Sequence, residues 1–168
     1  MAYDESRRLL YVCDSNQHQI VVLNANGEII RTIGQPGGQE GEFRIPVAVV
    51  CSADGSIVVA DSMNFRVQRF GADGDFLSAF GRKGDAAGDL SLPKGVAADH
   101  KGNFWVVDAQ FENVQAFTPK GELLLALGGE GHEPGQFWLP AGAFIDKQDR
   151  LWVADTYNRR LQVFQLMP

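Results

Sequence analysis

Hydrophobic residues occur along this chain in short runs that are separated by polar turn residues. Asp54-Gly55 and Asp73-Gly74 stand between such runs, and Asp-Gly pairs are typical of tight β-hairpin turns because both residues tolerate a positive φ. Short runs rich in Val, Ile and Phe predict β-strands, and no segment shows a sustained helical period. Within the second quarter of the chain, strands are predicted at Ala48–Cys51, Ile57–Ala60, Val67–Phe70 and Phe76–Phe80.

This four-strand pattern recurs with a period of 47 residues, which is the spacing of Asp14, Asp61, Asp108 and Asp155. The same step connects three further sets of residues, namely Pro46, Pro93 and Pro140, then Gly34, Gly81 and Gly128, and then Gly27, Gly74 and Gly121. A fixed period of this length is the signature of a repeat protein in which each copy forms one supersecondary unit.

The second strand of each unit is apolar throughout, which indicates that both of its faces are buried. These strands are expected at Leu10–Cys13, Ile57–Ala60, Phe104–Val107 and Leu151–Ala154. A small antiparallel sheet covered on both faces by neighbouring copies is a β-propeller blade, and such blades are roughly 40 to 50 residues long. The sequence therefore predicts an all-β chain forming one domain over residues 1–168, with antiparallel four-stranded blades at about 1–46, 47–93, 94–140 and 141–168.

The two ends of the chain do not complement each other. Residue 168 falls just before a fourth strand, so the last blade is expected to lack its outer strand, and residue 1 falls within a first strand. We therefore expect an open arc with an apolar sheet face at each end and an unpaired strand edge at Leu161–Leu166. Such an arc would be a piece of a longer propeller or would self-associate, and a closed four-bladed ring is the alternative.

The repeat resembles the NHL repeat over essentially the whole chain. The likeness runs through Pro93, Gly95, Val96, Ala97, Gly102, Asn103, Val106 and Asp108 in the third copy, and through Asn158, Arg160, Gln162 and Phe164 in the last. The chain resembles bacterial proteins with several NHL repeats, which are often exported. This resemblance implies a β-propeller, usually six-bladed, that serves as an interaction scaffold, with the present chain as a C-terminal portion of it.

Charge and hydropathy narrow the classes of partner. The formal net charge is −6 and the isoelectric point is about 5.0, which argues against nucleic acid as a partner because phosphate binding needs clustered Lys and Arg. No apolar run approaches the ~20 residues of a membrane-spanning helix. The polar stretch Met1–Arg8 shows no export signal, so the compartment stays open, and export would require a segment ahead of it.

Cys13 and Cys51 lie on predicted strands of different repeats, and neither has a counterpart in the other copies. We interpret them as two small buried residues without a disulfide bridge. They neither prove nor exclude an oxidising compartment.

A residue present in every copy serves every blade and is therefore expected to be structural. Asp14, Asp61, Asp108 and Asp155 each end a buried strand. A ring of four carboxylates could bind a metal, but an Asp in this position more commonly accepts hydrogen bonds from backbone N–H groups of the following turn. We expect the structural role, no bound metal and no cofactor.

Residues that depart from the repeat are the candidates for binding. The linkers between blades and the loops between second and third strands should share one face, and these loops carry aromatic residues beside cations, the side chains that are enriched in binding hot spots. The candidates are Phe65, Arg66, Phe111, Tyr157, Arg159 and Arg160, together with Trp138 and Lys94 near the mouth of the channel. Packing between adjacent loops is the alternative for each of them.

Catalytic patterns are weak in this sequence. His18, His100 and His132 occupy three unrelated repeat positions, whereas a metal site built around a channel would use one position in several copies. We therefore expect a non-catalytic module that binds a protein or peptide. The alternative is a metal-dependent lyase or lactonase acting in the central channel, and it is kept open by Asp99 and Asp146, which share one repeat position.

Overall fold

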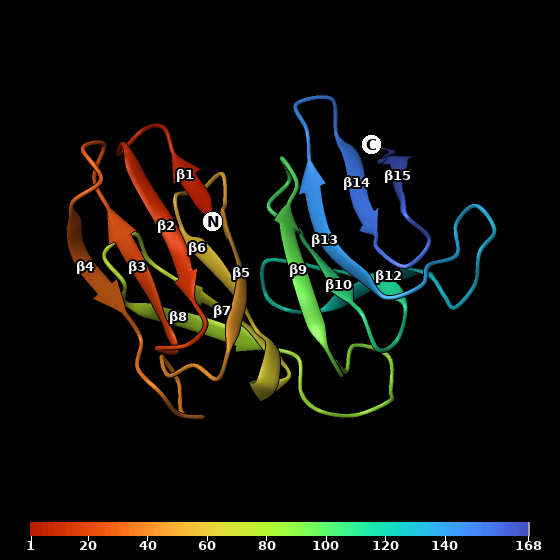
Figure 1. Cartoon of the computed structure of the whole chain (residues 1–168), viewed down its shortest axis with the longest axis horizontal. Coiled ribbons are helices and arrows are strands. Elements are labelled where there is room, and N and C mark those ends of the chain that lie inside the picture. Colours follow the sequence, from red (N-terminus) through yellow and green to blue (C-terminus); the bar gives the residue numbers. More distant parts are fainter. Residues whose placement is uncertain (168) are drawn as a thin grey trace.

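The structure, a computed structural model that describes residues 1–167, is an all-β chain folded into four antiparallel sheets (Figure 1). The final residue of the predicted fourth repeat, Pro168, lies outside the described residues. Blade 1 contains β1 (Ala2–Asp4), β2 (Leu9–Asp14), β3 (Gln19–Leu23) and β4 (Ile29–Ile33), and blade 2 contains β5 (Pro46–Cys51), β6 (Ile57–Asp61), β7 (Arg66–Phe70) and β8 (Phe76–Phe80). Blade 3 contains β9 (Pro93–Ala98), β10 (Phe104–Asp108), β11 (Asn113–Phe117) and β12 (Leu123–Gly128), and blade 4 contains β13 (Pro140–Ile145), β14 (Arg150–Asp155) and β15 (Arg160–Gln165).

This arrangement confirms the predicted blades, including a last blade of three strands. Within each sheet the strands follow one another in sequence order and pair antiparallel. Within residues 1–167, the only helical element is a single 3₁₀ turn at Ser62–Asn64. The strand positions agree closely with the apolar runs, because each run supplies the side chains that neighbouring blades cover.

The turns differ from the expectation in one respect. The glycine of each Asp-Gly pair has a positive φ, +82° at Gly55 and +95° at Gly74, whereas Asp54 and Asp73 do not. The aspartate contributes through its side chain instead, since the carboxylate of Asp54 accepts a hydrogen bond from the backbone N–H of Ser56 at 3.0 Å. The glycine of each pair therefore adopts the positive φ of the turn, and Asp54 stabilises its turn through a side-chain hydrogen bond.

Three apolar clusters hold successive blades together. The first joins blades 1 and 2, the second joins blades 2 and 3, and the third joins blades 3 and 4. The second strands of the two middle blades, β6 and β10, are buried along their whole length because both of their faces are covered. No comparable cluster joins blade 4 to blade 1 among the residues that the structure describes.

The four innermost strands surround one central hollow of about 390 Å³. It is lined by parts of β1, β5, β9 and β13, together with Met1, and the lining residues are Met1, Ala2, Tyr3, Val49, Val50, Cys51, Val96, Ala97, Ala98, Ala143, Phe144 and Ile145. The walls thus offer apolar side chains and backbone groups.

The two cysteines, one on β2 and one on β5, are unbridged, as expected. Both are half-buried rather than fully buried. Burial raises the pKa of the Cys13 and Cys51 thiols to about 11, which leaves them protonated and weakly reactive at neutral pH.

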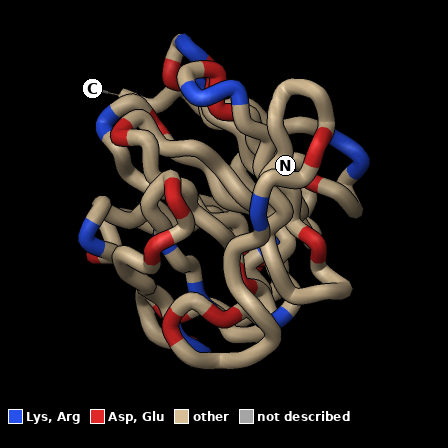
Figure 2. Tube along the Cα trace, turned by 90° about the vertical axis from the view of Figure 1, so that its left-hand side faces the viewer, with Lys and Arg blue, Asp and Glu red and all other residues tan. Residues whose placement is uncertain are grey.

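Charged residues are interspersed over the surface. Figure 2 shows the side of the molecule on which blade 1 lies, where basic and acidic stretches alternate along the loops and no continuous basic surface stands out. This distribution agrees with the acidic net charge of −6.

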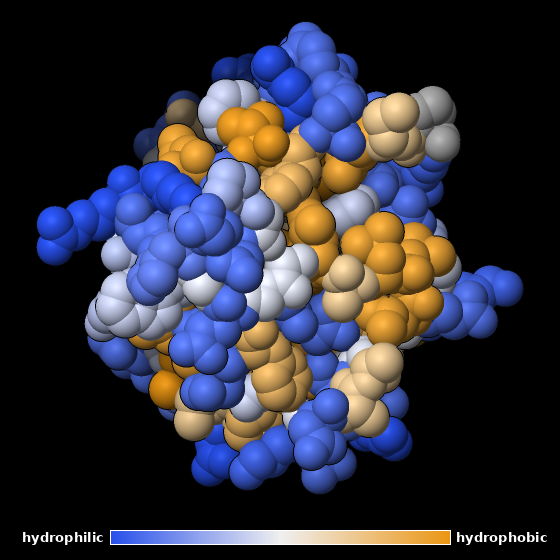
Figure 3. Space-filling view, turned by 90° about the vertical axis from the view of Figure 1, so that its right-hand side faces the viewer, coloured by the Kyte–Doolittle hydropathy of each residue, from blue (hydrophilic) through white to orange (hydrophobic). Residues whose placement is uncertain are grey.

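The outer face of blade 4 is an apolar surface that no other blade covers. Phe144, Trp152 and Val163 lie opposite one another across β13, β14 and β15, and Ala154 and Leu161 form the next cross-strand pair. Phe144 is 64% exposed and Leu161 is 65% exposed. Figure 3 shows hydrophobic residues gathered on the side of the molecule where this blade lies. The sequence predicts an exposed apolar face at this end, and the structure shows one.

Candidate functional site

The linkers between blades lie against the loops between second and third strands, and we call this surface the loop face. In blade 2 the Asn64 amide donates to the Gly37 carbonyl at 2.8 Å, and in blade 4 Asn158 donates to Gly131 at 2.9 Å. These hydrogen bonds hold each of these two linkers against the loop of its blade, on the face where the antiparallel blade topology places both.

Buried carboxylates organise this face. Asp61 accepts hydrogen bonds from the backbone N–H of Arg44 at 2.7 Å and from the side chains of Asn64, Arg66 and Gln68. Asp155 makes the equivalent set with Trp138, Asn158, Arg160 and Gln162. Burial alone would raise the pKa of Asp155, but these hydrogen bonds outweigh it and lower the pKa.

The donors differ in part from those that the sequence predicts. Asp14 accepts the N–H of Gln17 in the following turn, and Asp108 accepts N–H groups both from that turn, at Gln110 and Phe111, and from the preceding linker, at Ser91 and Leu92. Asp61 and Asp155 bind the preceding linker and, in place of the turn, three side chains at Asn-x-Arg-x-Gln spacing. That spacing is visible in the sequence at Asn64–Gln68 and Asn158–Gln162, and the second set is part of the NHL resemblance, but its role as a set of donors to the aspartate was not predicted.

Two of the candidate arginines are used inside the molecule. The Arg66 guanidinium binds Asp61 and the carbonyl oxygens of Gly38, Gln39 and Glu42, and Arg160 makes the corresponding contacts in blade 4. These contacts correspond to the alternative of packing between loops, so we leave both residues out of the binding surface proposed below.

Two other candidates come together on blade 4. The rings of Trp138 and Tyr157 meet edge to face with centroids 5.3 Å apart, and His132 packs against Trp138 at 5.1 Å. Trp138 is 40% exposed and Tyr157 is 57% exposed. We call these three residues the aromatic cluster. Sequence reasoning did not include His132, because its contact with Trp138 depends on how the linker folds.

The remaining candidates are distributed over the other blades. Phe65 lies beneath the Lys83 ammonium, 5.2 Å from the ring centroid, and Phe111 lines a small cavity of blade 3. Arg159 is exposed on blade 4, and Lys94 is half-buried on the innermost strand β9.

The four loops share one unusual backbone position. His18, Phe65, Glu112 and Arg159 stand 47 residues apart, and each adopts a left-handed conformation with φ between 52° and 58°. This conformation costs a non-glycine residue roughly 1–2 kcal/mol. The loop face therefore repeats one strained geometry while the side chain that it presents varies.

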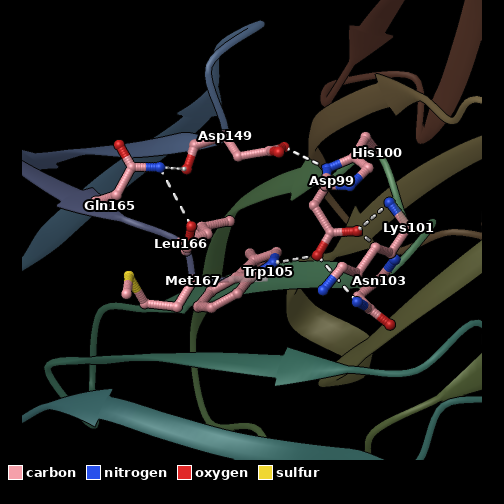
Figure 4. Close-up of a pocket in the computed structure, with 9 residues that line it drawn as sticks. All are labelled: Asp99, His100, Lys101, Asn103, Trp105, Asp149, Gln165, Leu166 and Met167. Carbon is pink, nitrogen blue, oxygen red and sulfur yellow. Dashed lines mark hydrogen bonds and ion pairs between the residues drawn. The ribbon is translucent and has the colours of Figure 1, made fainter.

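The opposite face of the molecule carries the loops between first and second strands and between third and fourth strands. A cavity of about 380 Å³ opens there between blades 3 and 4 (Figure 4). His100 contacts the Asp149 carboxylate at 2.6 Å, and the Trp105 indole donates to Asp99 at 3.1 Å.

Asp99 and Asp146, the carboxylates of the enzyme alternative, are engaged in these turns. Asp99 accepts hydrogen bonds from Lys101, Asn103 and Trp105. Burial would raise the pKa of Asp146, but hydrogen bonds from Trp152, Arg150 and Gln148 lower it to about 2. Neither residue is among those that line the central hollow. Residues 1–167 bring no three His, Cys, Asp or Glu side chains together in a metal-binding arrangement.

A search for membrane spans finds no helix in residues 1–167 that is long and apolar enough to cross a bilayer.

Comparison of the sequence with family models identifies an NHL repeat at residues 137–164, which covers the end of the last linker and the strands of blade 4. No curated protein matches the chain.

Solved β-propeller structures resemble the fold over nearly the whole chain. A streptogramin B lyase matches with a TM-score of 0.70 at 16% identity over 98% of this chain, and a chain of the nidogen/laminin complex matches with 0.73 at 16% over 98%. The virginiamycin B lyase from Staphylococcus aureus matches with 0.65 at 16% over 95%. At these identities the likeness concerns the fold. The present chain spans 53%, 58% and 53% of those three chains respectively, which is little more than half their length.

Proposed function

Because this chain folds as a β-propeller and carries an NHL repeat at residues 137–164, we propose that it is a non-catalytic scaffold that binds a protein or peptide partner on its loop face. The observation that carries the proposal is the aromatic cluster, in which Trp138 and Tyr157 remain substantially exposed while packing edge to face. Tryptophan and tyrosine are the residue types that most often dominate the binding energy of protein interfaces.

The scaffold holds this cluster in place. The backbone N–H of Trp138 donates to the buried Asp155 carboxylate at 2.8 Å, and the N–H of Tyr157 donates to the Trp138 carbonyl at 3.1 Å. His132 is fixed on the third side, since its Nδ1 lies 2.6 Å from Asn158 Oδ1. A surface that is already ordered loses little conformational entropy when a partner binds.

The comparisons support this class of function at the level of the fold. One of the similar propellers is a component of the nidogen/laminin complex, a complex between proteins. The resemblance to the NHL repeat also implies that the chain serves as an interaction scaffold.

The alternative is a lyase or lactonase acting in the central hollow, which is suggested by the two lyases among the similar structures. Such an enzyme would need acidic or basic groups in the hollow, and the residues that line it include no Asp, Glu, His, Lys or Arg. Elemental analysis of protein dialysed without chelator tests this alternative. We expect well under one equivalent of zinc or calcium, and a stoichiometric metal that stabilises the fold would favour the enzyme.

Affinity capture with matched variants tests the proposal. The tagged chain, a Trp138→Ala/Tyr157→Ala variant and a Lys120→Ala/Lys147→Ala control on the opposite face are each exposed to an extract of the cells that express the protein. We expect at least one protein that is captured saturably by the wild type and the control, but about tenfold or more weakly by the aromatic variant. Partners captured equally by all three, each with an unchanged melting temperature, would contradict the proposal.

A further inference from the structure

Blade 3 lacks the arginine that blades 2 and 4 place between loop and linker. In blade 2, Arg66 donates to Asp61 and to the Gly38, Gln39 and Glu42 carbonyl oxygens over 2.7–3.1 Å. In blade 4, Arg160 makes the equivalent contacts over 2.7–2.9 Å. The corresponding residue of blade 3 is Asn113, whose side chain makes no hydrogen bond to its linker within residues 1–167.

The linker of blade 3 nevertheless keeps the same fold as the other two. Gln115 accepts from the Gly88 N–H at 3.2 Å and donates to the Asp89 carbonyl at 2.9 Å, as Gln68 does with Gly41 and Glu42 in blade 2. The carbonyl oxygens that bind a guanidinium in blade 2 therefore have fixed counterparts in blade 3. Those counterparts belong to Asp85, Ala86 and Asp89.

A cavity of about 280 Å³ occupies the place of the missing arginine. Its walls include Asp85 and Ala86 from the linker, Phe111 and Asn113 from the loop, and Leu123 and Ala126 from β12. The Asn113 side-chain oxygen is buried and has no hydrogen-bond partner in the described structure.

The surroundings of this cavity favour a cation. The Asp85 carbonyl accepts no intramolecular hydrogen bond among residues 1–167, and the Asp85 side chain is exposed and forms no ion pair there. Asp108, which is fully buried, accepts only backbone N–H groups in that part of the chain, whereas its counterparts in blades 2 and 4 are paired with arginines. A guanidinium placed as Arg66 is placed in blade 2 would complement the open acceptors and would supply the cationic partner that Asp108 lacks.

We propose that this cavity binds the guanidinium of an arginine side chain presented by a partner polypeptide. Guanidinium suits the site better than ammonium because its planar fork of N–H donors can reach several carbonyl oxygens at once, as it does in the two neighbouring blades. The Phe111 ring provides a wall on which a guanidinium can stack. This inference names the side chain that the loop face recognises. It rests on the proposed function in one respect, namely that the partner is a polypeptide.

Titration with small peptides tests the guanidinium site directly and does not require the natural partner. The probes are N-acetyl-Gly-Arg-Gly-amide, its citrulline analogue, which is nearly isosteric but uncharged, and its lysine analogue. We expect the arginine peptide to shift the amide NMR signals of residues 85–89 and 111–115 in a saturable way, with weaker shifts for lysine and none for citrulline. Equal shifts for arginine and citrulline, or no localised shifts, would overturn the proposal.

An Asn113→Arg variant supplies the guanidinium from within the chain. This change recreates the pattern of Arg66 and Arg160, so we expect a higher melting temperature and loss of the arginine-peptide shifts. An Asn113→Leu variant fills the same space without charge and should not raise the melting temperature in the same way. A lower melting temperature or failure to fold in Asn113→Arg would count against the proposal, because the cavity would then not accept a guanidinium.

These outcomes are distinguishable from failure of the proposed function. If peptides do not bind but partner capture still depends on Trp138 and Tyr157, the arginine site is refuted and binding of a partner on the loop face is supported. If the arginine peptide binds but no partner depends on the aromatic cluster, the arginine site is supported and the proposed function is refuted.

Discussion

Buried aspartates at the ends of the second strands of blades 2 and 4 hold the loop against the preceding linker. Asp61 and Asp155 bind a linker N–H, an asparagine, an arginine and a glutamine, so one carboxylate ties together the linker, the loop and the third strand. Their recurrence in every copy is the basis on which the sequence predicts a structural role. Their partners could not be predicted, because these depend on how the linker folds back over the loop.

Replacement of Asp61 by alanine should destabilise the fold by about 1–3 kcal/mol, since it leaves buried donors without an acceptor. The control is Asp14→Ala, because Asp14 accepts a single exposed backbone bond and should cost much less. Urea unfolding of both variants measures the difference. Loss of partner capture by Asp61→Ala without any loss of stability would refute the structural role.

The carboxylate of Asp146 should contribute a pH-dependent part of the stability. Its pKa in the folded state is about 2, below the ordinary value of 3.8, so it stabilises the fold above pH 4 and this contribution is lost as the pH falls toward 2. We expect Asp146→Asn to be less stable than the wild type at pH 7, with the difference shrinking toward pH 2. A difference in urea midpoint that does not change with pH would rule out this assignment.

At the scale of elements, strands and turns follow from local sequence, whereas contacts between loops do not. The runs at Ile57–Ala60 and Phe104–Val107 predicted β6 and β10 to within a residue, because their continuous apolar character requires burial on both faces. The contact between His132 and Trp138, and the hydrogen bonds of Arg66 to its own linker, depend on how closely the linker and the loop approach each other. The sequence of a single repeat does not determine that approach. The candidate site could therefore be predicted as a face, but not residue by residue.

The open face of blade 4 should make the 168-residue chain self-associate. Phe144, Leu161 and Val163 expose apolar area whose burial yields roughly 25 cal/mol per Å², and β15 is a sheet edge. We expect light scattering to show dimers or larger species at rising concentration, and a Leu161→Lys/Val163→Lys variant to be largely monomeric. A wild-type chain that stays monomeric at high micromolar concentration would show that this face is not a site of association.

At the scale of the whole molecule, the repeat gives a rigid support on which one face varies. The four blades share the strand order, apart from the missing fourth strand of blade 4, and the left-handed loop position, and the three linkers share one bridge between their ends. The side chains presented on the loops differ from blade to blade. A scaffold of this kind can carry a binding surface without changing its core. The central hollow has no comparable variation of charged groups, since the residues that line it include no Asp, Glu, His, Lys or Arg.

Site-specific photo-crosslinking in the cells that express the protein tests binding on the loop face most directly. A photoreactive benzophenone amino acid is placed at Tyr157 on the loop face or, as the matched control, at Lys147 on the opposite face; both positions are exposed. The account predicts a discrete crosslinked protein adduct from position 157 that disappears when Trp138 is also replaced by alanine, and none from position 147. Adducts that form equally at both positions, or only at 147, would contradict it.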